Sequence, residues 1–350
     1  MSRQPAYARI SMPPGLEAFD CQVQDCAWSG WRSAGRGAPL GEGMAPDNGS
    51  KSDKASDSDK ASDSDTASDS DTASATDRSE QGPRPVVLML HGTGGSRVSW
   101  RPVLNELLKS HSAGPRSQPD LQLLIPDLPG HDATHCGRHS THGLREMADD
   151  LRALLQHLGI EQLDLVVGHS AGAAVAIWLS LLGVPIKKIL GVAPSLVPPP
   201  ALYNLMLGPL LTPLFVSSPS VAGLSALARG TRIVDGLIAS TGSQIPADQQ
   251  EEYRRIFAQR SHVKGAIEFM AGTDLPTLLA RGNELKAELS LLIAEDDRWI
   301  PASGLRRVAR NHFPRANLQF CRGGHLVQEV NPGLVAEAMR RMLLAAKMPQ

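Results

Sequence analysis

The amino-acid sequence predicts an α/β protein in which a mostly parallel central sheet carries helices on both faces. Short apolar runs alternate with amphipathic segments along most of the chain, and this alternation specifies parallel strands joined by crossover helices. Several of the runs end directly in glycine-rich or carboxylate-rich turns. One run leads into the pentapeptide GHSAG and a segment of small residues, which is the strand-turn-helix context of a nucleophilic serine.

Length and charge limit the classes of protein to which the chain can belong. Its 350 residues are enough for one large domain or two small ones with a sizeable core. The 35 basic and 36 acidic residues give a formal net charge of -1 and are spread along the chain. Because a nucleic-acid partner requires a basic patch, no DNA or RNA partner is expected.

The cysteines and the apolar residues bear on location. Cys21, Cys26, Cys136 and Cys321 stand in no metal-ligand or redox spacing, so we expect reduced thiols in the cytoplasm. The N-terminal segment MSRQPAYARISMPPGLEAFD lacks the basic start and the apolar run of a signal peptide. No apolar stretch reaches the roughly 20 residues of a spanning helix. Any membrane contact is therefore expected to be peripheral, at the inner-membrane surface.

Residues 1–40 are expected to contribute the first strand region of the core. Phe19, Cys21 and Val23 alternate with polar residues, and this period of two is typical of a half-buried strand. Residues 84–193 are expected to continue the core, beginning with PVVLML, an apolar run that suits a strand covered on both faces. The segment GLREMADDLRALLQHLG has apolar residues at helical spacing. Further strands are predicted at LQLLIP, LDLVV, KKILGVA, LSLLIAE and NLQFC, and further helices near Trp100 and from Ala171.

Residues 41–83 differ in composition from the rest of the chain. Their repeat KASDSDKASDSDTASDSDTASATD contains no large apolar side chain. Such a segment cannot offset an ordering entropy of about 1–2 kcal/mol per residue, so a disordered, solvated insertion is predicted. A phosphorylated or calcium-binding arm is the alternative, although the repeat lacks the glycine turn and closing glutamate of a calcium loop.

Residues 194–285 are predicted to form a helical cap inserted into the core, which resumes over residues 286–350. The stretch SLVPPPALYNLMLGPLLTPLF is rich in Pro and Leu and contains no strand-like run. Its apolar residues either pack against one another or form a binding surface. Pro198, Pro199 and Pro200 cannot lie inside a regular helix, so part of the cap must bend.

Ser170 is the predicted nucleophile. It lies at the centre of Gly168-His169-Ser170-Ala171-Gly172, directly after the strand LDLVV. A sharp turn at this point lifts the hydroxyl above the sheet, and the two glycines leave room for neighbouring backbone. Outside this context the same pentapeptide would indicate only a turn.

Asp297 and His325 are predicted to activate this serine. A serine hydroxyl needs a base to accept its proton and an acid to fix the tautomer of that base. Each candidate follows an apolar strand, and the acid precedes the histidine along the chain, as is usual after a nucleophile elbow. Asp297 is preferred to Asp296 and Glu295 because it stands four residues before Pro301. A surface loop histidine is the alternative for His325.

The backbone amides of Thr93 and Ala171 are the candidates for an oxyanion hole. A tetrahedral intermediate carries a negative oxygen, and loss of one donor to it costs roughly 3 kcal/mol or more. Ala171 opens the helix after the serine, and Thr93 lies in the sequence HGTGG, residues 91–95. This loop could instead be a tight turn or a phosphate loop, but it lacks the lysine and the spacing of a Walker motif. The residues expected to border the substrate are His91, Gly92, Gly94 and His169.

Four histidines in the loop DLPGHDATHCGRHSTHG raise the question of a metal site. Neutral imidazoles suit zinc, but the loop is polar and has no matching cysteine pair. No metal or other cofactor is therefore expected, and Asp127 and Pro129 are interpreted as loop-shaping residues. The four histidines are His131, His135, His139 and His142.

The motifs together resemble those of the α/β-hydrolases. They are HGTGGSRVSW, PDLPGH, GHSAGAAVA, EDDRWIP and GGHLVQE, and the cap adds STGS, HVKGAI and MAGTDL. The cap words resemble one branch, the magnesium-chelatase accessory proteins of bacteriochlorophyll biosynthesis. The resemblance covers nearly the whole chain outside residues 41–83 and implies a nucleophile at Ser170, an acid at Asp297 and a base at His325. In two departures, PDLPGHG continues here as PDLPGHDAT, and the acidic repeat separates the first two strands.

The resemblance implies a role beside magnesium insertion into a porphyrin, with magnesium chelatase as a partner. Three functional hypotheses follow. The first is a serine hydrolase acting on an ester, amide or thioester of an apolar small molecule held under the cap. The second is an accessory protein that binds a porphyrin or a chelatase subunit without turnover, and the third is a general carboxylesterase unrelated to pigment synthesis. Three catalytic groups and an oxyanion loop favour the first hypothesis, since a pure binding module has no use for them.

Overall fold

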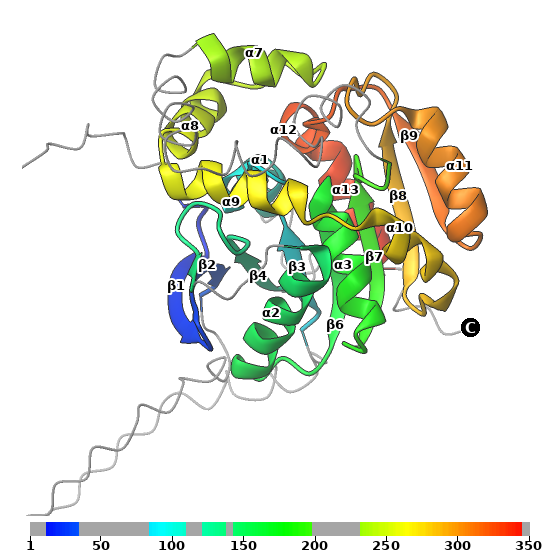
Figure 1. The fold of residues 1–350 in the computed structure, drawn as a ribbon, viewed down its shortest axis with the longest axis horizontal. Helices are drawn as coiled ribbons and strands as arrows, with labels where there is room; N and C mark the ends of the chain where they lie inside the picture. The colour runs from blue at the N-terminus through cyan, green and yellow to red at the C-terminus, as the bar shows by residue number, and fades with distance from the viewer. Residues whose placement is uncertain (1–11, 35–83, 110–120, 138–142, 198–231, 345–350) are drawn as a thin grey trace, which may run out of the picture.

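The computed structural model describes five stretches of the chain (Figure 1). They are residues 12–34, 84–109, 121–137, 143–197 and 232–344. The predicted acidic insertion and the Pro-rich first part of the predicted cap lie outside these stretches. The predicted domain boundaries therefore stay predictions.

A single sheet forms the centre of the described part of the chain. Its strand order is β1-β2-β4-β3-β6-β7-β8-β9, and β5 pairs with β2. From β4 to β9 all neighbouring strands are parallel, whereas β2 is antiparallel to β1, β4 and β5. This confirms the predicted mostly parallel sheet. The strands are β1 (Leu16–Val23), β2 (Cys26–Ser33), β3 (Val86–Leu90), β4 (Gln122–Pro126), β5 (His135–Cys136), β6 (Leu163–His169), β7 (Ile186–Val192), β8 (Glu288–Ala294) and β9 (Asn317–Cys321).

Helices cover both faces of this sheet, as predicted (Figure 1). One face carries α2 (Leu144–His157) and α3 (Ala171–Leu181), and the other carries α1 (Arg101–Lys109) and α13 (Pro332–Leu344). Strand β6 shows why the strands are apolar throughout. Val166 packs in the cluster under α2 and α3, while its neighbours Leu165 and Val167 pack in the cluster under α1 and α13.

Helices α7 (Arg232–Ser240), α8 (Ala247–Phe257) and α9 (Arg260–Ala271) lie together at one end of the sheet (Figure 1). They belong to the predicted cap, and no strand occurs in its described parts, residues 194–197 and 232–285. Among the described residues, no helix combines the length and the apolar character needed to cross a membrane. The shorter and later helices are η1 (Arg97–Trp100), α10 (Leu275–Ala280), η3 (Gly282–Glu284), α11 (Ala302–His312) and α12 (Val327–Val330).

A disulfide joins Cys26 to Cys136, so the prediction of four reduced thiols is wrong for this pair. The two cysteines are 110 residues apart in sequence, yet they are direct cross-strand partners in the antiparallel pair β2 and β5. The two cysteines meet because the loop after β4 returns to β2, where β5 pairs with it. The spacing of cysteines in the sequence does not reveal this return of the chain. Cys21 and Cys321 are free thiols.

Helix α9 meets the loop after β4 at a glycine. A Cβ atom on Gly265 would lie 2.1 Å from the carbonyl oxygen of Gly130, so only glycine permits this approach. Gly236 in helix α7 is exposed, and a Cβ atom added there would have no neighbouring atom within 4 Å. Unlike Gly265, it is not required by a close contact.

We therefore expect Gly265→Ala to destabilise the protein and Gly236→Ala to stabilise it. Alanine is favoured over glycine in a helix by roughly 0.5–1 kcal/mol, and only at Gly265 does a backbone clash oppose this gain. Thermal denaturation of both variants and the wild type measures the difference. Equal melting temperatures for the two variants would contradict the tight contact between α9 and Gly130.

Candidate active site

Ser170 occupies a sharp turn between β6 and α3. Its backbone has φ 53° and ψ -120°, a left-handed conformation that a non-glycine residue adopts only when its surroundings enforce it. A Cβ atom on Gly168 would lie 2.4 Å from the Ala173 nitrogen, and one on Gly172 would lie 2.5 Å from the Leu90 carbonyl oxygen. Both glycines are therefore required by the close approach of backbone on each side of the turn.

The structure brings Ser170, His325 and Asp297 together from three separate connections. The Nε2 atom of His325 lies 2.8 Å from the Ser170 Oγ atom, and its Nδ1 atom lies 2.7 Å from the Asp297 Oδ2 atom. All three residues are buried. In the tautomer whose proton is on Nδ1, that N–H group donates a hydrogen bond to the carboxylate. The Nε2 atom is then free to accept a hydrogen bond from the serine hydroxyl.

The two neighbouring aspartates have different surroundings. The second oxygen of Asp297, Oδ1, accepts hydrogen bonds from the backbone amides of Trp299 and Ile300 at 2.8 and 2.9 Å. These donors fix the orientation of the carboxylate, so that its other oxygen faces the imidazole. Asp296 instead points to Arg322 and to the Gly323 amide, at 3.1 and 3.0 Å. Of these two aspartates, only Asp297 is in contact with the ring of His325.

The HGTGG loop lies against the serine. A Cβ atom on Gly92 would be 2.8 Å from the Ser170 Cβ atom, so glycine allows the loop to approach the nucleophile. Thr93, Gly94 and Gly95 continue from there along the wall of the adjacent cavity. Ala171 is the first residue of α3, and an amide at that position has no acceptor within its own helix.

Two histidines predicted to border the substrate have different positions. His169 lines the cavity, and its Nε2 atom donates to the carbonyl oxygen of His325 at 2.9 Å. Burial holds the pKa of His169 well below its usual value, so the ring is neutral. His91 does not line the cavity. It is fully buried behind the loop, where its Nε2 atom accepts from the Leu128 amide at 2.9 Å, and burial lowers its pKa to about 4. His91 therefore supports the loop and does not contact the substrate space.

The cavity beside Ser170 is lined mostly by apolar side chains and encloses about 40 Å³. Cap helices α7 and α8 form one wall, and the residues that flank the acid and the base form another. The apolar side chains that line it are Val234, Leu237, Ile238, Phe257, Trp299 and Leu326. Part of the predicted cap thus lines this cavity, while its use as a binding surface, one of the two alternatives considered for its apolar residues, stays a prediction.

The STGS segment of the cap supports the acid and base loops, a role that sequence reasoning did not assign. The Thr241 carbonyl oxygen accepts from the His325 amide at 3.0 Å, and the Ser243 Oγ atom accepts from the Leu326 amide at 2.9 Å. A Cβ atom on Gly324 would lie 2.4 Å from the Gly242 carbonyl carbon. The sequence did single out STGS as a motif that resembles one branch of the hydrolases. Its position beside His325, however, can be seen only in the folded structure.

Sequence reasoning also missed a second hydroxyl that lies near Ser170. The Ser195 Oγ atom lies 3.3 Å from the Ser170 Oγ atom, and the Ser195 amide donates to the Ser170 carbonyl oxygen at 3.0 Å. Ser195 follows strand β7, next to β6 in the sheet. No motif in the sequence selects it, because its position depends on that strand pairing.

The departure from PDLPGHG has a structural role. Asp132, which stands where the motif has its last glycine, accepts hydrogen bonds from Arg255 at 2.7 Å and from Gln259 at 3.0 Å. It therefore joins the loop after β4 to the cap. At the base of the loop Asp127 forms a buried ion pair with Arg97 and accepts from its amide, which agrees with a loop-shaping role.

The histidine-rich loop forms no imidazole metal site among its described residues. His131 is buried and packs against the rings of His91 and His262, with ring centroids 5.2 and 5.4 Å away. His135 is exposed on β5. His139 and His142 lie outside the described residues.

A buried glutamate connects α12 to α8 behind the cavity. The two carboxyl oxygens of Glu329 accept hydrogen bonds from the Tyr253 hydroxyl and the Gln249 amide, both at 2.7 Å. Burial raises the pKa of Glu329 from 4.5 to about 8, although both hydrogen bonds oppose this shift. The carboxyl group of Glu329 therefore binds its proton more tightly in the folded protein than in the unfolded chain.

Because the folded pKa is the higher one, the stability contributed by Glu329 is complete below about pH 4.5 and is lost as the pH rises through about 8. Glutamine does not titrate, so the melting temperature of Glu329→Gln should fall less than that of the wild type between about pH 5 and 9. Glu337→Gln on the exposed side of α13 is the control and should follow the wild type. Parallel pH profiles for wild type and Glu329→Gln would contradict the assignment.

Comparisons with known proteins agree with this geometry. Residues 87–338 match the model of the alpha/beta hydrolase family. The magnesium-chelatase 30 kDa subunit of Rhodobacter capsulatus is 30% identical over 261 residues, which are 74% of this chain and 86% of that protein.

Solved structures show the same fold. A thermophilic esterase from Thermogutta terrifontis aligns with a TM-score of 0.57 at 17% identity, over 76% of this chain and 92% of the esterase. An epoxide hydrolase aligns with a TM-score of 0.62 at 15% identity, over 95% of this chain and 100% of the epoxide hydrolase. The predicted α/β-hydrolase fold is thereby confirmed, and the chain belongs to the alpha/beta hydrolase family.

Proposed function

We propose that this protein is a serine hydrolase in which Ser170 is the nucleophile, His325 the general base and Asp297 the acid that orients the base. The observation that carries the proposal is the continuous chain of contacts from the Ser170 Oγ atom through the His325 ring to Asp297, with distances of 2.8 and 2.7 Å. Such contacts join a nucleophile, a base and an orienting acid within hydrogen-bond reach.

In the first half of the reaction Ser170 attacks the carbonyl carbon of the substrate. Its hydroxyl proton passes to the Nε2 atom of His325, and Asp297 stabilises the resulting imidazolium across the 2.7 Å contact. The proton then goes from Nε2 to the leaving group, which departs as an alcohol, amine or thiol. An acyl group remains on the serine oxygen.

In the second half a water molecule attacks this acyl group. His325 accepts a proton from the water and returns it to the serine oxygen when the acid product leaves. In both halves the carbonyl oxygen becomes negative, and the amides of Thr93 and Ala171 are the proposed donors to it. Their support is the position of the HGTGG loop against Ser170 and of Ala171 at the start of α3.

The cavity indicates the class of substrate. Its apolar walls favour an apolar small molecule whose ester, amide or thioester carbonyl reaches the polar end of the cavity, where Gly92, Gly94 and His169 border the serine. Among the described residues that line the cavity there is no lysine or arginine.

Ser170→Ala should abolish hydrolysis of small activated esters, with a loss of about 10⁴-fold or more in turnover.

Asp297→Asn should lose far more activity than its matched control Asp296→Asn, because an amide cannot hold His325 in the required tautomer. Labelling with a fluorophosphonate, followed by mapping of the modified residue, identifies the nucleophile independently. A wild-type rate in Ser170→Ala, or the reverse order of the two asparagine variants, would overturn these assignments.

As a biological role we propose assistance to magnesium chelatase in bacteriochlorophyll biosynthesis, with a porphyrin as a candidate substrate. The support is the relationship to a protein named as a 30 kDa subunit of magnesium-chelatase. A cytoplasmic location, with peripheral contact at the inner membrane, is a further proposal. The cysteine argument for the cytoplasm no longer supports it, because Cys26 and Cys136 are paired.

The same relative favours a second candidate, an accessory protein that binds a porphyrin or the chelatase without turnover. Complementation of a strain that lacks the gene separates the two. If the role requires catalysis, Ser170→Ala fails to restore pigment synthesis although the variant is present and folded. Full restoration by that variant would show that binding alone is sufficient, since the loss of one hydroxyl leaves the apolar cavity almost unchanged.

A further inference from the structure

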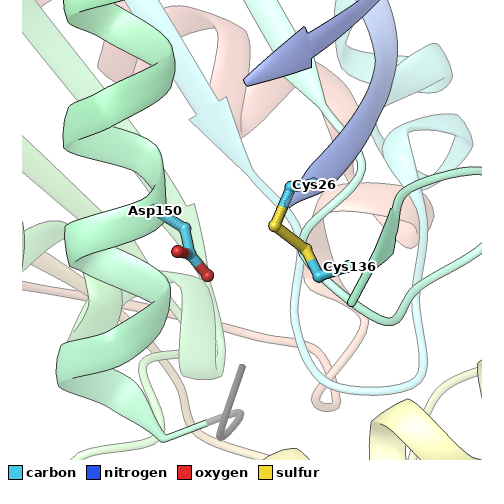
Figure 2. Close-up of side chains that lie close together, drawn as sticks. All are labelled: Cys26, Cys136 and Asp150. Carbon is cyan, nitrogen blue, oxygen red and sulfur yellow. A yellow bond between two sulfur atoms is a disulfide. The ribbon is translucent and has the colours of Figure 1, made fainter. Parts of the chain in front are cut away.

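Two sulfur atoms and a carboxylate meet at a corner of the molecule away from Ser170. Figure 2 shows the Cys26–Cys136 disulfide and the side chain of Asp150, which extends from α2 toward it. Each of the three residues offers one ligand atom, and these atoms all lie within 4.8 Å of one another. They come from β2, β5 and α2, and β2 is far in sequence from the other two elements, which follow one another along the chain.

Within the residues that the structure describes, Asp150 has no basic partner of the kind that a half-buried carboxylate usually has. Its neighbour Asp149 forms an ion pair with Arg152 at 2.8 Å, but no ion pair to Asp150 occurs in the described part of the chain. Burial, and then the negative charges of Asp25, Asp149 and Glu146, raise the pKa of Asp150 to about 6. The corner is therefore rich in negative charge and would be stabilised by a cation.

We propose that reduction of the Cys26–Cys136 disulfide creates a binding site for one zinc-like divalent cation, with both thiolates and the Asp150 carboxylate as ligands. Thiolate ligands select borderline-soft ions such as Zn²⁺ over Mg²⁺, which prefers oxygen. Two sulfurs and one carboxylate oxygen leave the fourth tetrahedral position to water or to Asp25, whose Oδ1 atom lies 3.8 Å from the Cys26 sulfur.

The geometry requires little rearrangement. At a zinc–sulfur distance of about 2.3 Å, two sulfurs of a tetrahedral site are roughly 3.8 Å apart. Cys26 and Cys136 face each other across paired strands, so rotation of their side chains can separate the sulfurs by that amount without breaking the strand pairing. The carboxylate on α2 already faces the same point (Figure 2).

The chemistry proceeds in two balanced steps. A dithiol reductant supplies two electrons: the sulfur–sulfur bond breaks, each protein sulfur takes one proton, and the reductant becomes a disulfide. The cation then displaces one proton from each thiol, and a third from the fraction of Asp150 that is protonated. The disulfide and the metal site therefore exclude each other, because the same two sulfurs form either one.

The site would act on the loop that follows β4. That loop ends in β5, and it contacts both the HGTGG loop through Leu128 and the cap through Asp132. Either the disulfide or a bound cation would hold its end to β2. This proposal does not depend on the role of Ser170.

The test uses the full chain, reduced with a water-soluble phosphine that is converted to its oxide and then removed. Titration with Co²⁺ should show one bound ion with a thiolate-to-cobalt absorption band, and Zn²⁺ should displace it. The oxidised protein should show no such band. Binding without a thiolate band in the reduced protein, or the same band in the oxidised protein, would overturn the proposal.

Variants identify the ligands. Cys26→Ser and Cys136→Ser should lose the band, and Asp150→Asn should bind Co²⁺ about tenfold or more weakly, the scale on which the loss of a single polar partner acts at metal sites. Cys21→Ser should bind as the wild type does, and Asp149→Asn, which removes one nearby negative charge but no ligand, should weaken binding much less than Asp150→Asn does. Equal affinities of Asp150→Asn and Asp149→Asn would contradict the assignment of Asp150.

A measurement on the wild type covers the case in which a cysteine variant fails to fold. The reduced protein is alkylated with iodoacetamide with and without Zn²⁺, and each cysteine is quantified by mass spectrometry. Zinc should protect Cys26 and Cys136, while Cys21 and Cys321 react at the same rate in both samples. Equal alkylation of all four cysteines with and without zinc would overturn the proposal.

Discussion

The turn between β6 and α3 brings a strand, a helix and the HGTGG loop so close together that only glycine fits at three positions around Ser170. Gly168 and Gly172 face backbone atoms, and Gly92 faces the serine itself. The serine takes a positive φ because this packing leaves it no other conformation. The position of the hydroxyl relative to His325, and of the loop amides relative to the hydroxyl, depends on this turn.

The cap takes part in the site in two ways. Helices α7 and α8 supply apolar walls to the cavity, whereas Thr241 and Ser243 accept hydrogen bonds from the backbone amides of His325 and Leu326. A shift of the cap would therefore change the shape of the cavity and the support of His325 together. Glu329 and Asp132 add polar links between cap and core, so the predicted insertion is energetically part of the site.

The corner formed by β2, β5 and α2 departs from the sequence-based expectation of reduced thiols, because Cys26 and Cys136 are paired in a disulfide. Each of its three residues is unremarkable in the sequence: two cysteines without a motif and one of several acids on an amphipathic helix. Their proximity results from the antiparallel edge of the sheet, where β5 returns to β2. A short strand of two residues has no periodicity from which it could be predicted.

The sequence by itself determined the α/β class, the order of most strands and helices, and the candidates Ser170, Asp297 and His325, because each of these follows from local periodicity or from a turn at the end of a strand. The tertiary structure alone decided which carboxylate faces the histidine ring, that His91 supports a loop, and that Ser195, Thr241 and Ser243 surround the triad. It also decided the pairing of Cys26 with Cys136. These features depend on contacts between segments that are distant in the chain, and such contacts arise only when the strands are ordered in a sheet and the cap is docked on it.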